Sequence, residues 1–401
     1  MTAFYLYDDA RARAIAPFAL TRPLGEMRAG AELVRRRWEM AFGTPAAGMV
    51  AAPHLEAFEE PGAPPAAPAA LPARAVLVNT RCVAPLGWKA RDVDVWTCGG
   101  EIAAVRLARD TPVAELARGD APLQALGAPG SRVEAVDGRW ITAAWSFIAD
   151  LPAQLREDIA VLGPRAAAAQ PAGAIVVGAQ PIYVEPDAVI EPGVCFDVSA
   201  GPVLVRRGAT VRAFTRLVGP CVVGDGATVL GDRVAACAIG DGAVVRGELS
   251  ETIVLGQSNK SHDGFVGHSY LGRWVNLGAG TITSNLKNTY GTVQMWTPNG
   301  MQDTGLLKLG TMFGDHVKTG IGLRLTTGSV VGAGSNVYGS IMPPKVVPPF
   351  SWGEGRAFDT YRLDKFLETA ERAMGRRGVP LGERARRQLS EAYALAAGVA
   401  V

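Results

Sequence analysis

In five successive runs through the middle of the chain (184–196, 205–229, 239–245, 265–277 and 307–337), mostly apolar residues recur at every sixth position, a spacing that neither an amphipathic helix nor an alternating strand produces. Glycine often follows the spaced residue within three positions. The spaced residues are Val184, Ile190, Phe196, Val205, Val211, Leu217, Val223, Val229, Ile239, Val245, Phe265, Leu271, Leu277, Leu307, Phe313, Thr319, Leu325, Val331 and Val337. Six residues suffice for one short strand and one turn, so this pattern predicts a parallel β-helix whose stacked coils bury the spaced side chains. We place it over residues 174–349.

The residues before this region show a different pattern, in which short apolar runs alternate with helix-like segments. The runs at residues 75–78, 93–96 and 102–107 predict strands, and the pattern at residues 31–42 predicts a helix. Residues 60–73 and 164–174 are mostly Pro, Ala and Gly, which predicts a surface loop or spacer and an interdomain linker. We therefore predict an α/β domain over residues 1–163.

Two amphipathic patterns close the chain and predict helices. The first contains Phe358, Tyr361, Phe366, Ala370 and Met374, and the second contains Leu389, Tyr393 and Leu395. Because the ends of a solenoid need a polar cover, we predict a C-terminal helical cap over residues 350–401.

Composition narrows the class of protein. Among 401 residues, 40 Lys and Arg against 38 Asp and Glu give a net charge of +2. This balance provides no basic surface for nucleic acid or a membrane, and 48% hydrophobic residues exclude global disorder. The five cysteines show no Cys-x-x-Cys spacing, and no apolar stretch approaches a membrane span. We expect a cytoplasmic protein with reduced cysteines, no signal peptide and no structural zinc.

The six-residue pattern is interrupted between Asn285 and Leu307, and an insertion into a repeat often lies on the binding face. His262, His268 and His316 flank this interruption. Five of the seven lysines also fall between residues 260 and 345, where arginine occurs only twice; they are Lys260, Lys287, Lys308, Lys318 and Lys345. Compact ammonium groups suit phosphates that need no planar partner, so we predict a phosphate site here. The alternative is a solvated rim of the β-helix.

His262 is the residue that we single out for catalysis. Imidazole is the natural base for removing a proton from an attacking amine near neutral pH. An isolated histidine is more often structural, so its spacing alone leaves both interpretations open.

The segments around His262 resemble a known enzyme family. The run from His262 to Asn285, which includes Val-Asn-Leu-Gly-Ala-Gly-Thr-Ile-Thr-Ser-Asn at residues 275–285, resembles the acetyltransferase half of the bifunctional UDP-N-acetylglucosamine pyrophosphorylase/glucosamine-1-phosphate acetyltransferases. Residues 303–310 and 314–320 look still closer to the archaeal bifunctional sugar-1-phosphate nucleotidyltransferase/acetyltransferases. Residues 16–23, followed by Ala29-Gly30, resemble the opening of sugar nucleotidyltransferases. A short-headed bacterial variant, classed as a sugar nucleotidyltransferase, is similar across the whole length.

This resemblance implies a left-handed β-helix that forms a homotrimer, with acetyl-CoA bound between neighbouring helices. It implies that His262 deprotonates the 2-amine of glucosamine 1-phosphate, and that the Ala279-Gly280 backbone stabilises the oxyanion formed from the thioester. The implied substrate-binding residues are Lys260, Phe265, Asn276, Asn285, Lys308 and Lys318. The implied acetyl-CoA-binding residues are Ala279, Gly280, Thr319 and Gly320.

Three positions depart from the family pattern. Phe265 stands where the family usually has Tyr, and His268 stands where an Asp is expected. The glycine-rich loop that cradles a nucleoside triphosphate is absent, and residues 8–13 read Asp-Asp-Ala-Arg-Ala-Arg instead. The candidates for nucleotide binding are therefore Arg11, Arg13, Arg22 and Arg28. Mg²⁺ is implied together with the triphosphate, and its carboxylate ligands stay unassigned among Asp92, Asp94 and Asp137.

The leading interpretation is a transferase of nucleotide-sugar synthesis for the cell envelope. It would acetylate glucosamine 1-phosphate with acetyl-CoA, and its nucleotidyltransferase-like first domain would use UTP or dTTP to make products such as UDP-N-acetylglucosamine. One alternative is a sugar-1-phosphate nucleotidyltransferase whose β-helix only oligomerises. Another is a non-catalytic sugar-nucleotide sensor, suggested by the missing glycine loop.

Overall fold

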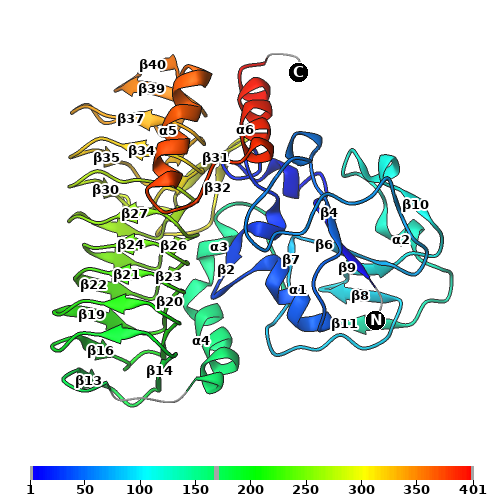
Figure 1. The fold of residues 1–401 in the computed structure, drawn as a ribbon, viewed down its shortest axis with the longest axis horizontal. Coiled ribbons are helices and arrows are strands. Elements are labelled where there is room, and N and C mark those ends of the chain that lie inside the picture. The colour runs from blue at the N-terminus through cyan, green and yellow to red at the C-terminus, as the bar shows by residue number, and fades with distance from the viewer. Residues whose placement is uncertain (1–2, 167–170, 399–401) are drawn as a thin grey trace. The chain divides into compact units, whose positions relative to one another are not determined.

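The computed structural model describes residues 3–166 and 171–398, which divide into two compact units (Figure 1). Within the described residues, the head comprises residues 3–15, 19–146 and 382–398, and the β-helix unit comprises residues 16–18, 147–166 and 171–381. Helix α5 (Leu363–Gly375) groups with the β-helix unit and helix α6 (Glu383–Ala396) with the head. The predicted domain bounds stay predictions. Part of the predicted linker, residues 167–170, lies outside the described residues.

A six-stranded mixed sheet forms the core of the head, as the α/β pattern predicts. The strands lie in the order β11 (Val133–Ala135), β8 (Val95–Cys98), β9 (Glu101–Arg106), β6 (Val76–Asn79), β1 (Phe4–Tyr7) and β4 (Gly48–Val50). Strand β1 pairs in parallel with both β4 and β6, whereas β9 is antiparallel to β6 and β8. The carboxyl ends of β1 and β6 therefore meet at one edge of the sheet.

Two details of the head differ from the sequence pattern. Helix α1 (Val34–Phe42) begins later than residue 31, because β2 (Arg28–Ala29) and β3 (Glu32–Leu33) pair with each other first. Residues 60–73 are not only a loop, since β5 (Ala70–Leu71) pairs with β10 (Thr111–Pro112). Strand β7 (Cys82–Val83) pairs with β12 (Arg139–Trp140), and α2 covers Leu123–Leu126.

The β-helix unit confirms the predicted left-handed parallel β-helix, whose short strands stack in three parallel sheets (Figure 1). The nine-stranded sheet contains β14 (Ile182–Val184), β17 (Val203–Val205), β20 (Cys221–Val223), β23 (Ala238–Ile239), β26 (Ile253–Val254), β29 (Tyr270–Leu271), β33 (Met312–Phe313), β36 (Val330–Val331) and β38 (Val346–Val347). The six-stranded sheet contains β13 (Ile175–Val177), β16 (Cys195–Asp197), β19 (Thr215–Val218), β22 (Asp232–Ala235), β25 (Leu249–Ser250) and β28 (Val266–Gly267).

We call the third side of the β-helix the cavity face. It contains β15 (Val189–Ile190), β18 (Thr210–Val211), β21 (Thr228–Val229), β24 (Val244–Val245) and β27 (Asn259–Lys260), followed by β34 (Lys318–Thr319), β37 (Asn336–Val337), β39 (Ser351–Glu354) and β40 (Ala357–Thr360). Between the two groups, Asn276 bridges to Asn259 on one side and to Lys318 on the other. Successive coils therefore stack equivalent positions in register along this face.

The spaced apolar residues form the core of the β-helix, as predicted. Phe196, Val223, Val245 and Phe313 are fully buried in one continuous cluster. Two spaced residues are exceptions. Phe265 is only partly buried and lies outside the core cluster, where Val266 takes its place, and Leu307 is 57% exposed, so the coil resumes only after it. The stacking of these side chains removes apolar surface from water, which drives folding of a repeat that cannot bury its own face.

The interruption of the repeat is a β-hairpin. Strand β31 (Gln294–Thr297) pairs antiparallel with β32 (Gly300–Asp303), between β30 (Ile282–Thr283), which pairs with β35 (Arg324–Leu325), and β33. Helices α3 (Ser146–Ala149) and α4 (Leu151–Leu162) precede the first coil. In the part of the chain that the structure describes, no helix is both long and apolar enough to cross a bilayer.

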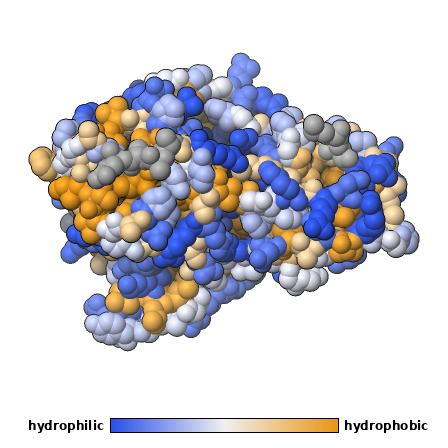
Figure 2. Space-filling view, turned by 90° about the horizontal axis from the view of Figure 1, so that it is seen from below, coloured by the Kyte–Doolittle hydropathy of each residue, from blue (hydrophilic) through white to orange (hydrophobic). Residues whose placement is uncertain are grey.

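Exposed apolar side chains occur along the β-helix. Phe214 is 85% and Ile321 78% exposed, and Ile341 is 60% exposed. On the face of the molecule in Figure 2, apolar patches also interrupt the polar surface. Such patches on a soluble surface often mark contacts with another chain.

Candidate functional site

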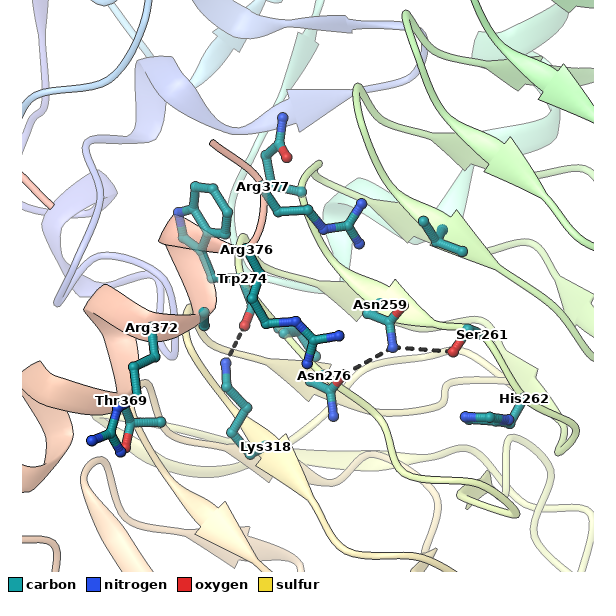
Figure 3. Close-up of a pocket in the computed structure, with 14 residues that line it drawn as sticks. Asn259, Ser261, His262, Trp274, Asn276, Lys318, Thr369, Arg372, Arg376 and Arg377 are labelled. Carbon is teal, nitrogen blue, oxygen red and sulfur yellow. Dashed lines mark hydrogen bonds between the residues drawn. The ribbon is translucent and has the colours of Figure 1, made fainter. Parts of the chain in front are cut away.

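A cavity of about 770 Å³ lies within the β-helix unit, between the cavity face and helix α5 (Figure 3). The β-helix contributes Asn259, Ser261, His262, Trp274, Asn276 and Lys318 to its lining. Thr369 and Arg372 of α5, with Arg376 and Arg377 just beyond its end, line the opposite side. Three residues that the sequence singled out, His262, Asn276 and Lys318, therefore line the same cavity.

His262 lies in the loop that joins β27 to β28, at the corner between two sheets. Its imidazole is exposed and faces the cavity (Figure 3). The loop can turn here because Gly264 adopts φ +112°, and a Cβ at that position would approach the Thr281 carbonyl oxygen to 2.3 Å. A residue with a side chain would clash there, so glycine holds the loop against the next coil.

Lys260 anchors the same loop from inside the β-helix. Its ammonium group donates hydrogen bonds to the carbonyl oxygens of His262 and Asp263, and only 1% of the residue is exposed. Burial lowers the pKa of Lys260 to about 8, against a smaller opposing effect of the Asp263 carboxylate. Lys260 was predicted to bind substrate, but its ammonium is directed at the loop backbone and it is not among the residues that line the cavity.

Asn259, Asn276 and Lys318 form a column along the cavity face, because their strands are paired in register. The Asn259 side-chain amide donates to the Asn276 amide oxygen at 2.9 Å and to the Ser261 hydroxyl at 3.2 Å. Because the Asn276 oxygen accepts this bond, its amide nitrogen is the end available to a ligand. The column therefore presents polar groups at regular spacing beside His262.

The ammonium group of Lys318 donates a short hydrogen bond to the Trp274 carbonyl oxygen. Burial lowers its pKa to about 8. No carboxylate lies within 4.0 Å of it among the residues that the structure describes. A desolvated cation without a counter-ion is costly unless a ligand supplies the negative charge, so Lys318 is a candidate for binding an anion.

Phe265, Asn285 and Lys308 gather around His268 and do not line the cavity. The Asn285 amide contacts His268 Nδ1 at 2.9 Å, and His268 Nε2 lies 3.4 Å from a Glu251 carboxylate oxygen. His268, and then more weakly Lys308, lowers the pKa of Glu251. Phe265 packs beside this group, since a Cβ on Gly267 would lie 2.4 Å from its ring and 2.8 Å from the Asn285 amide nitrogen. These predicted substrate-binding residues thus form a second polar cluster.

The four predicted acetyl-CoA-binding residues are engaged within the coils. The Gly280 amide donates to the Asp263 carbonyl at 3.3 Å, the Gly320 amide donates to Val337, and the Ala279 carbonyl accepts from Gly322 at 2.7 Å. The Thr319 hydroxyl contacts the Thr281 hydroxyl at 2.8 Å and accepts from the Gly278 amide at 3.0 Å. The Gly280 N–H, offered above as an oxyanion donor, is therefore directed at the loop that carries His262.

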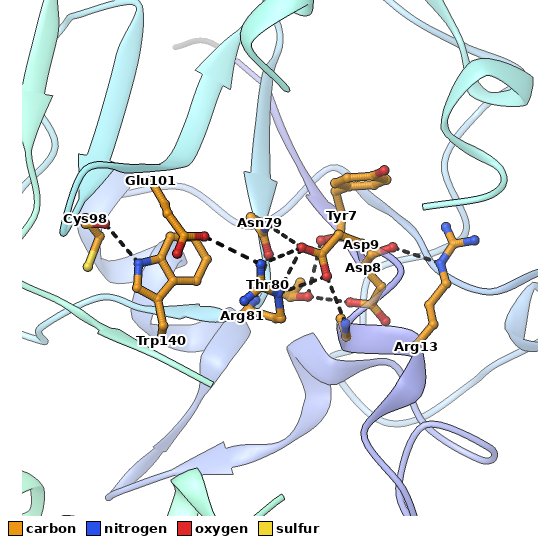
Figure 4. A network of polar contacts seen from close by, with 11 residues as sticks. Tyr7, Asp8, Asp9, Arg13, Asn79, Thr80, Arg81, Cys98, Glu101 and Trp140 are labelled. Atoms are coloured by element: carbon orange, nitrogen blue, oxygen red, sulfur yellow. Dashed lines mark hydrogen bonds and ion pairs between the residues drawn. The ribbon is translucent and has the colours of Figure 1, made fainter. Parts of the chain in front are cut away.

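A separate polar network lies in the head, where the parallel strands β1 and β6 end (Figure 4). Asp8 accepts hydrogen bonds from the Thr80 hydroxyl at 2.5 Å and the Leu24 amide at 3.0 Å, yet burial raises its pKa to about 6. Asp9 pairs with Arg81 at 2.8 Å. In open α/β sheets, ligands bind beyond the carboxyl ends of the strands where the strand order reverses, as it does at β1.

Of the four arginines predicted to bind a nucleotide, three are held within the head. Arg13 donates to the carbonyl oxygens of Asp8, Leu116 and Ala117. Arg22 forms a two-pronged pair with Glu60 at 2.7 and 2.6 Å, and Arg28 donates to the Ala31 carbonyl. Arg11 alone is exposed.

Two of the three carboxylates considered for Mg²⁺ are engaged elsewhere: Asp92 pairs with Arg106 at 2.7 Å, and Asp94 lies 3.5 Å from the same guanidinium. Asp137 is exposed. Across residues 3–166 and 171–398, no three or more His, Cys, Asp or Glu side chains gather closely enough to hold a metal ion.

The arginines at the end of α5 were not among the predicted site residues. The predicted helix already placed Phe366, Ala370 and Met374 on one face, and all three are buried. Arg372 and Arg376, offset from that face by two residues, had to lie on the other side of the helix. That signal was present, but the sequence did not indicate that α5 would cover the cavity face.

Comparisons with known proteins identify a family for the N-terminal part of the chain and several relatives. Residues 4–165 match the family described as sugar nucleotidyl transferases. A bifunctional sugar-1-phosphate nucleotidylyltransferase/acetyltransferase of Sulfurisphaera tokodaii is 33% identical over 91 residues, which is 23% of each chain. The bifunctional protein GlmU of Gluconobacter oxydans is 30% identical over 188 residues, 45% of this chain and 39% of that protein. The match thus spans from about a quarter to two fifths of these relatives' length.

A solved structure of AntD, an N-acyltransferase from Bacillus cereus in complex with dTDP-4-amino-4,6-dideoxyglucose and coenzyme A, aligns with 51% of this chain and 92% of its own at 14% identity and a TM-score of 0.24. The N-terminal part of the chain therefore matches the sugar nucleotidyl transferases, and the chain is related, at modest identity, to proteins named bifunctional sugar-1-phosphate nucleotidylyltransferase/acetyltransferase and GlmU.

Proposed function

We propose that the β-helix unit transfers an acetyl group from acetyl-CoA to the amine of an amino-sugar 1-phosphate, with glucosamine 1-phosphate as the first candidate. The observation that carries this proposal is the exposed imidazole of His262 in a cavity that also contains the Asn259–Asn276 amide pair and the ammonium of Lys318. Relatives named as acetyltransferases support the same reaction.

Acetyl transfer to an amine requires a base and polar groups that bind the substrate. The amine nitrogen attacks the thioester carbonyl carbon, a C–N bond forms, and the C–S bond breaks to release the thiol. The His262 imidazole accepts the proton that the amine loses, which leaves the amide product neutral at nitrogen, and the imidazolium then returns this proton to the leaving thiolate. The Asn276 amide nitrogen and Lys318 orient the polar substrate, which converts a bimolecular encounter into a reaction of held partners.

Thiol release from acetyl-CoA in the presence of a panel of amino-sugar phosphates tests this function. Replacing His262 by Ala should lower kcat by about 10²–10⁴-fold, the usual contribution of a positioned base. Asp263→Asn is the matched control, because that exposed side chain adjoins His262 but does not line the cavity. Unchanged thiol release by His262→Ala would eliminate the proposed role and leave a β-helix that only oligomerises.

We also propose that the head transfers a nucleotidyl group from UTP or dTTP to a sugar 1-phosphate, at the edge where β1 and β6 end. The support is the family match over residues 4–165 and the polar network at that edge. Pyrophosphate release, measured with each nucleotide, Mg²⁺ and candidate sugar phosphates, tests it. If neither pyrophosphate nor thiol is released although the ligands bind, the chain is a sensor of sugar nucleotides.

The proposed acyl transfer is expected in a homotrimer in the cytoplasm. Exposed Phe214, Ile321 and Ile341 on the β-helix supply apolar surface that a second copy would cover. Light scattering during size-exclusion chromatography measures the mass directly, and a monomer at working concentration would contradict the expected assembly.

A further inference from the structure

The cavity that contains His262 has an unusual balance of charge. Its lining includes the cations Lys318, Arg372, Arg376 and Arg377, whereas no Asp or Glu lines it. The four cations come from both sides, Lys318 from the cavity face and the arginines from α5 and the turn after it (Figure 3). Cations that line one cavity repel one another, so a bound anion would reduce this electrostatic repulsion and stabilise the folded protein.

Helix α5 is oriented so that its arginines face the cavity. Phe366, Ala370 and Met374 are buried on one face of the helix, and Phe366 packs edge-to-face on Phe350 at 5.0 Å. Thr369, Arg372 and Arg376 follow one another at spacings of three and four, which puts them on a single stripe. The packing of the apolar face therefore decides that this stripe lines the cavity.

Two of the three guanidinium groups at the end of α5, those of Arg376 and Arg377, lack acidic partners in the described part of the chain. Arg372 pairs with Glu368 one turn earlier in an exposed contact, but no carboxylate lies within 4.0 Å of Arg376 or Arg377. Arg377 donates to the Gly242 carbonyl at 3.2 Å, which ties the end of the helix to the β-helix. Burial, and then the charge of Arg376, lowers the pKa of Arg377.

The helix dipole explains part of this arrangement of cations. Cations near a helix C-terminus offset the partial negative charge of the last carbonyl groups, and that alone stabilises a helix modestly. It does not explain why a lysine without a counter-ion lies on the opposite wall, or why acidic side chains are missing from the whole lining.

We propose that Arg372, Arg376 and Arg377 form, with Lys318, a phosphate-binding subsite that orients the substrate in the cavity toward His262. The ligand is a phosphate ester, because guanidinium groups bind phosphate through paired, charge-assisted hydrogen bonds and lysine adds a point charge. Two sources offer that chemistry: the phosphates of coenzyme A and the phosphate of the sugar. This inference rests on the proposed acyl transfer and names residues of the same site.

The number of cations favours the coenzyme as the source. A sugar monophosphate carries about two negative charges near neutral pH. Coenzyme A contains a 3′-phosphorylated adenosine diphosphate, which carries about twice as many. The cavity volume of about 770 Å³ lies within the range of sites that enclose small ligands. An anion of high charge would compensate Lys318, Arg376 and Arg377, which have no carboxylate partner among the described residues, and would also contact Arg372, which pairs with Glu368.

Calorimetry on the full chain measures the subsite without requiring catalysis. The probes are coenzyme A, coenzyme A lacking the 3′-phosphate, and glucosamine 1-phosphate. We expect Arg376→Gln to weaken binding of coenzyme A at least tenfold and the double variant Arg376→Gln/Arg377→Gln to weaken it further. Lys365→Gln is the matched control, because it removes one positive charge from an exposed position of the same helix that does not line the cavity.

The probes distinguish the two sources of phosphate. If the coenzyme is the ligand, removal of its 3′-phosphate should weaken binding to the wild-type chain but have little further effect on the arginine variants. If the sugar phosphate is the ligand, Arg376→Gln should weaken binding of glucosamine 1-phosphate and leave coenzyme A unaffected. In either case the steady-state KM for that substrate rises in thiol release, while kcat changes less.

The subsite and the acyl transfer can fail separately. Arginine-dependent binding without any thiol release would overturn the proposed reaction and retain the subsite. Thiol release that the double variant leaves unchanged, or affinities within twofold of the wild type for every probe, would overturn the subsite alone. Failure of all probes to bind the wild-type chain would also overturn it. Thermal unfolding followed by circular dichroism verifies that each variant is folded.

Discussion

The head and the β-helix unit both bury charged groups, but they neutralise them differently. In the head, Arg81 is 5% exposed and pairs with Asp9 at 2.8 Å, and its guanidinium also lies 4.9 Å from the centre of the Trp140 ring. In the β-helix unit, Lys318 donates to a backbone carbonyl and has no described carboxylate within reach. Buried pairs of the first kind hold a fold together, whereas a half-buried cation that lines a cavity, as Lys318 does, is available to a ligand.

The largest expected effect comes from breaking the buried pair in the head. Asp9→Ala leaves the Arg81 guanidinium without its nearest carboxylate, so the free energy of unfolding of the head should fall by about 3–5 kcal/mol. Urea denaturation followed by tryptophan fluorescence measures this. Asp92→Ala is the control, because that carboxylate also pairs with a buried arginine but is itself 80% exposed, and we expect a loss of about 1 kcal/mol or less. Equal losses in the two variants would contradict the comparison.

A smaller effect should appear as a dependence of stability on pH, through Asp8. Burial raises the pKa of Asp8 from 3.8 to about 6, although Thr80 and Leu24 donate to it. The folded state therefore holds this proton more tightly than the unfolded state does. The resulting contribution is fully present below about pH 4 and is lost as the pH rises through 6, and it amounts to about 3 kcal/mol.

Asp8→Asn removes this titrating group, so the free energy of unfolding of the variant should depend less on pH than that of the wild type. We expect the stability of the wild-type head, relative to Asp8→Asn, to increase as the pH falls from 7 to 4. Arg13 and Asp9 also act on the Asp8 carboxyl, and both are retained in the variant. Stability curves of the two proteins that run parallel across this range would show that Asp8 titrates normally.

The smallest effect on stability should come from the unpaired cation. Lys318→Met removes a desolvated charge and one hydrogen bond to the Trp274 carbonyl, two changes of opposite sign, so the free energy of unfolding should change by no more than about 1 kcal/mol. The same variant should bind the phosphate ligand at least tenfold more weakly. Denaturation and calorimetry on one preparation give both values.

The pH dependence of Lys318 sharpens this test. Burial lowers its pKa to about 8, so the folded state releases this proton more readily than the unfolded state does, and stability should rise between about pH 8 and 10.5. Ligand affinity should fall over the same rise in pH, because the cavity loses one cation while the arginines stay charged. A large loss of stability in Lys318→Met would mean that the lysine is structural.

Much of the fold was predictable from the sequence. The six-residue spacing identified the β-helix, because each stacked coil must place one apolar side chain in the core, and Phe196, Val223 and Phe313 are buried as expected. Leu307 fits the same spacing but lies outside the core, because spacing alone cannot distinguish a residue of a coil from one in the segment between the hairpin and the next coil. Three strands of the head, β6, β8 and β9, followed from short apolar runs, whereas β1, β4 and β11 of the same sheet and the short pairings at residues 28–33 and 70–71 were not predicted.

The candidate site was only partly predictable. His262, Asn276 and Lys318 were selected from the sequence and line one cavity, but Asn285 and Lys308 lie instead with His268, and Lys260 is directed at the backbone. Residue type shows what a side chain can bind, but not which way it points. The acetyl-CoA-binding role of Thr319 and the nucleotide-binding role of Arg11 stay predictions.

The sequence by itself determined the coil, because a core of stacked side chains requires the same apolar position in every repeat, and that requirement is written in the order of residues. It also determined that α5 has one apolar face, with Arg372 and Arg376 on the opposite side. Only the tertiary structure decided that these arginines would oppose Lys318 and His262 across a cavity. That arrangement depends on packing between segments a hundred residues apart, where the energy comes from surfaces that meet only after the chain has folded.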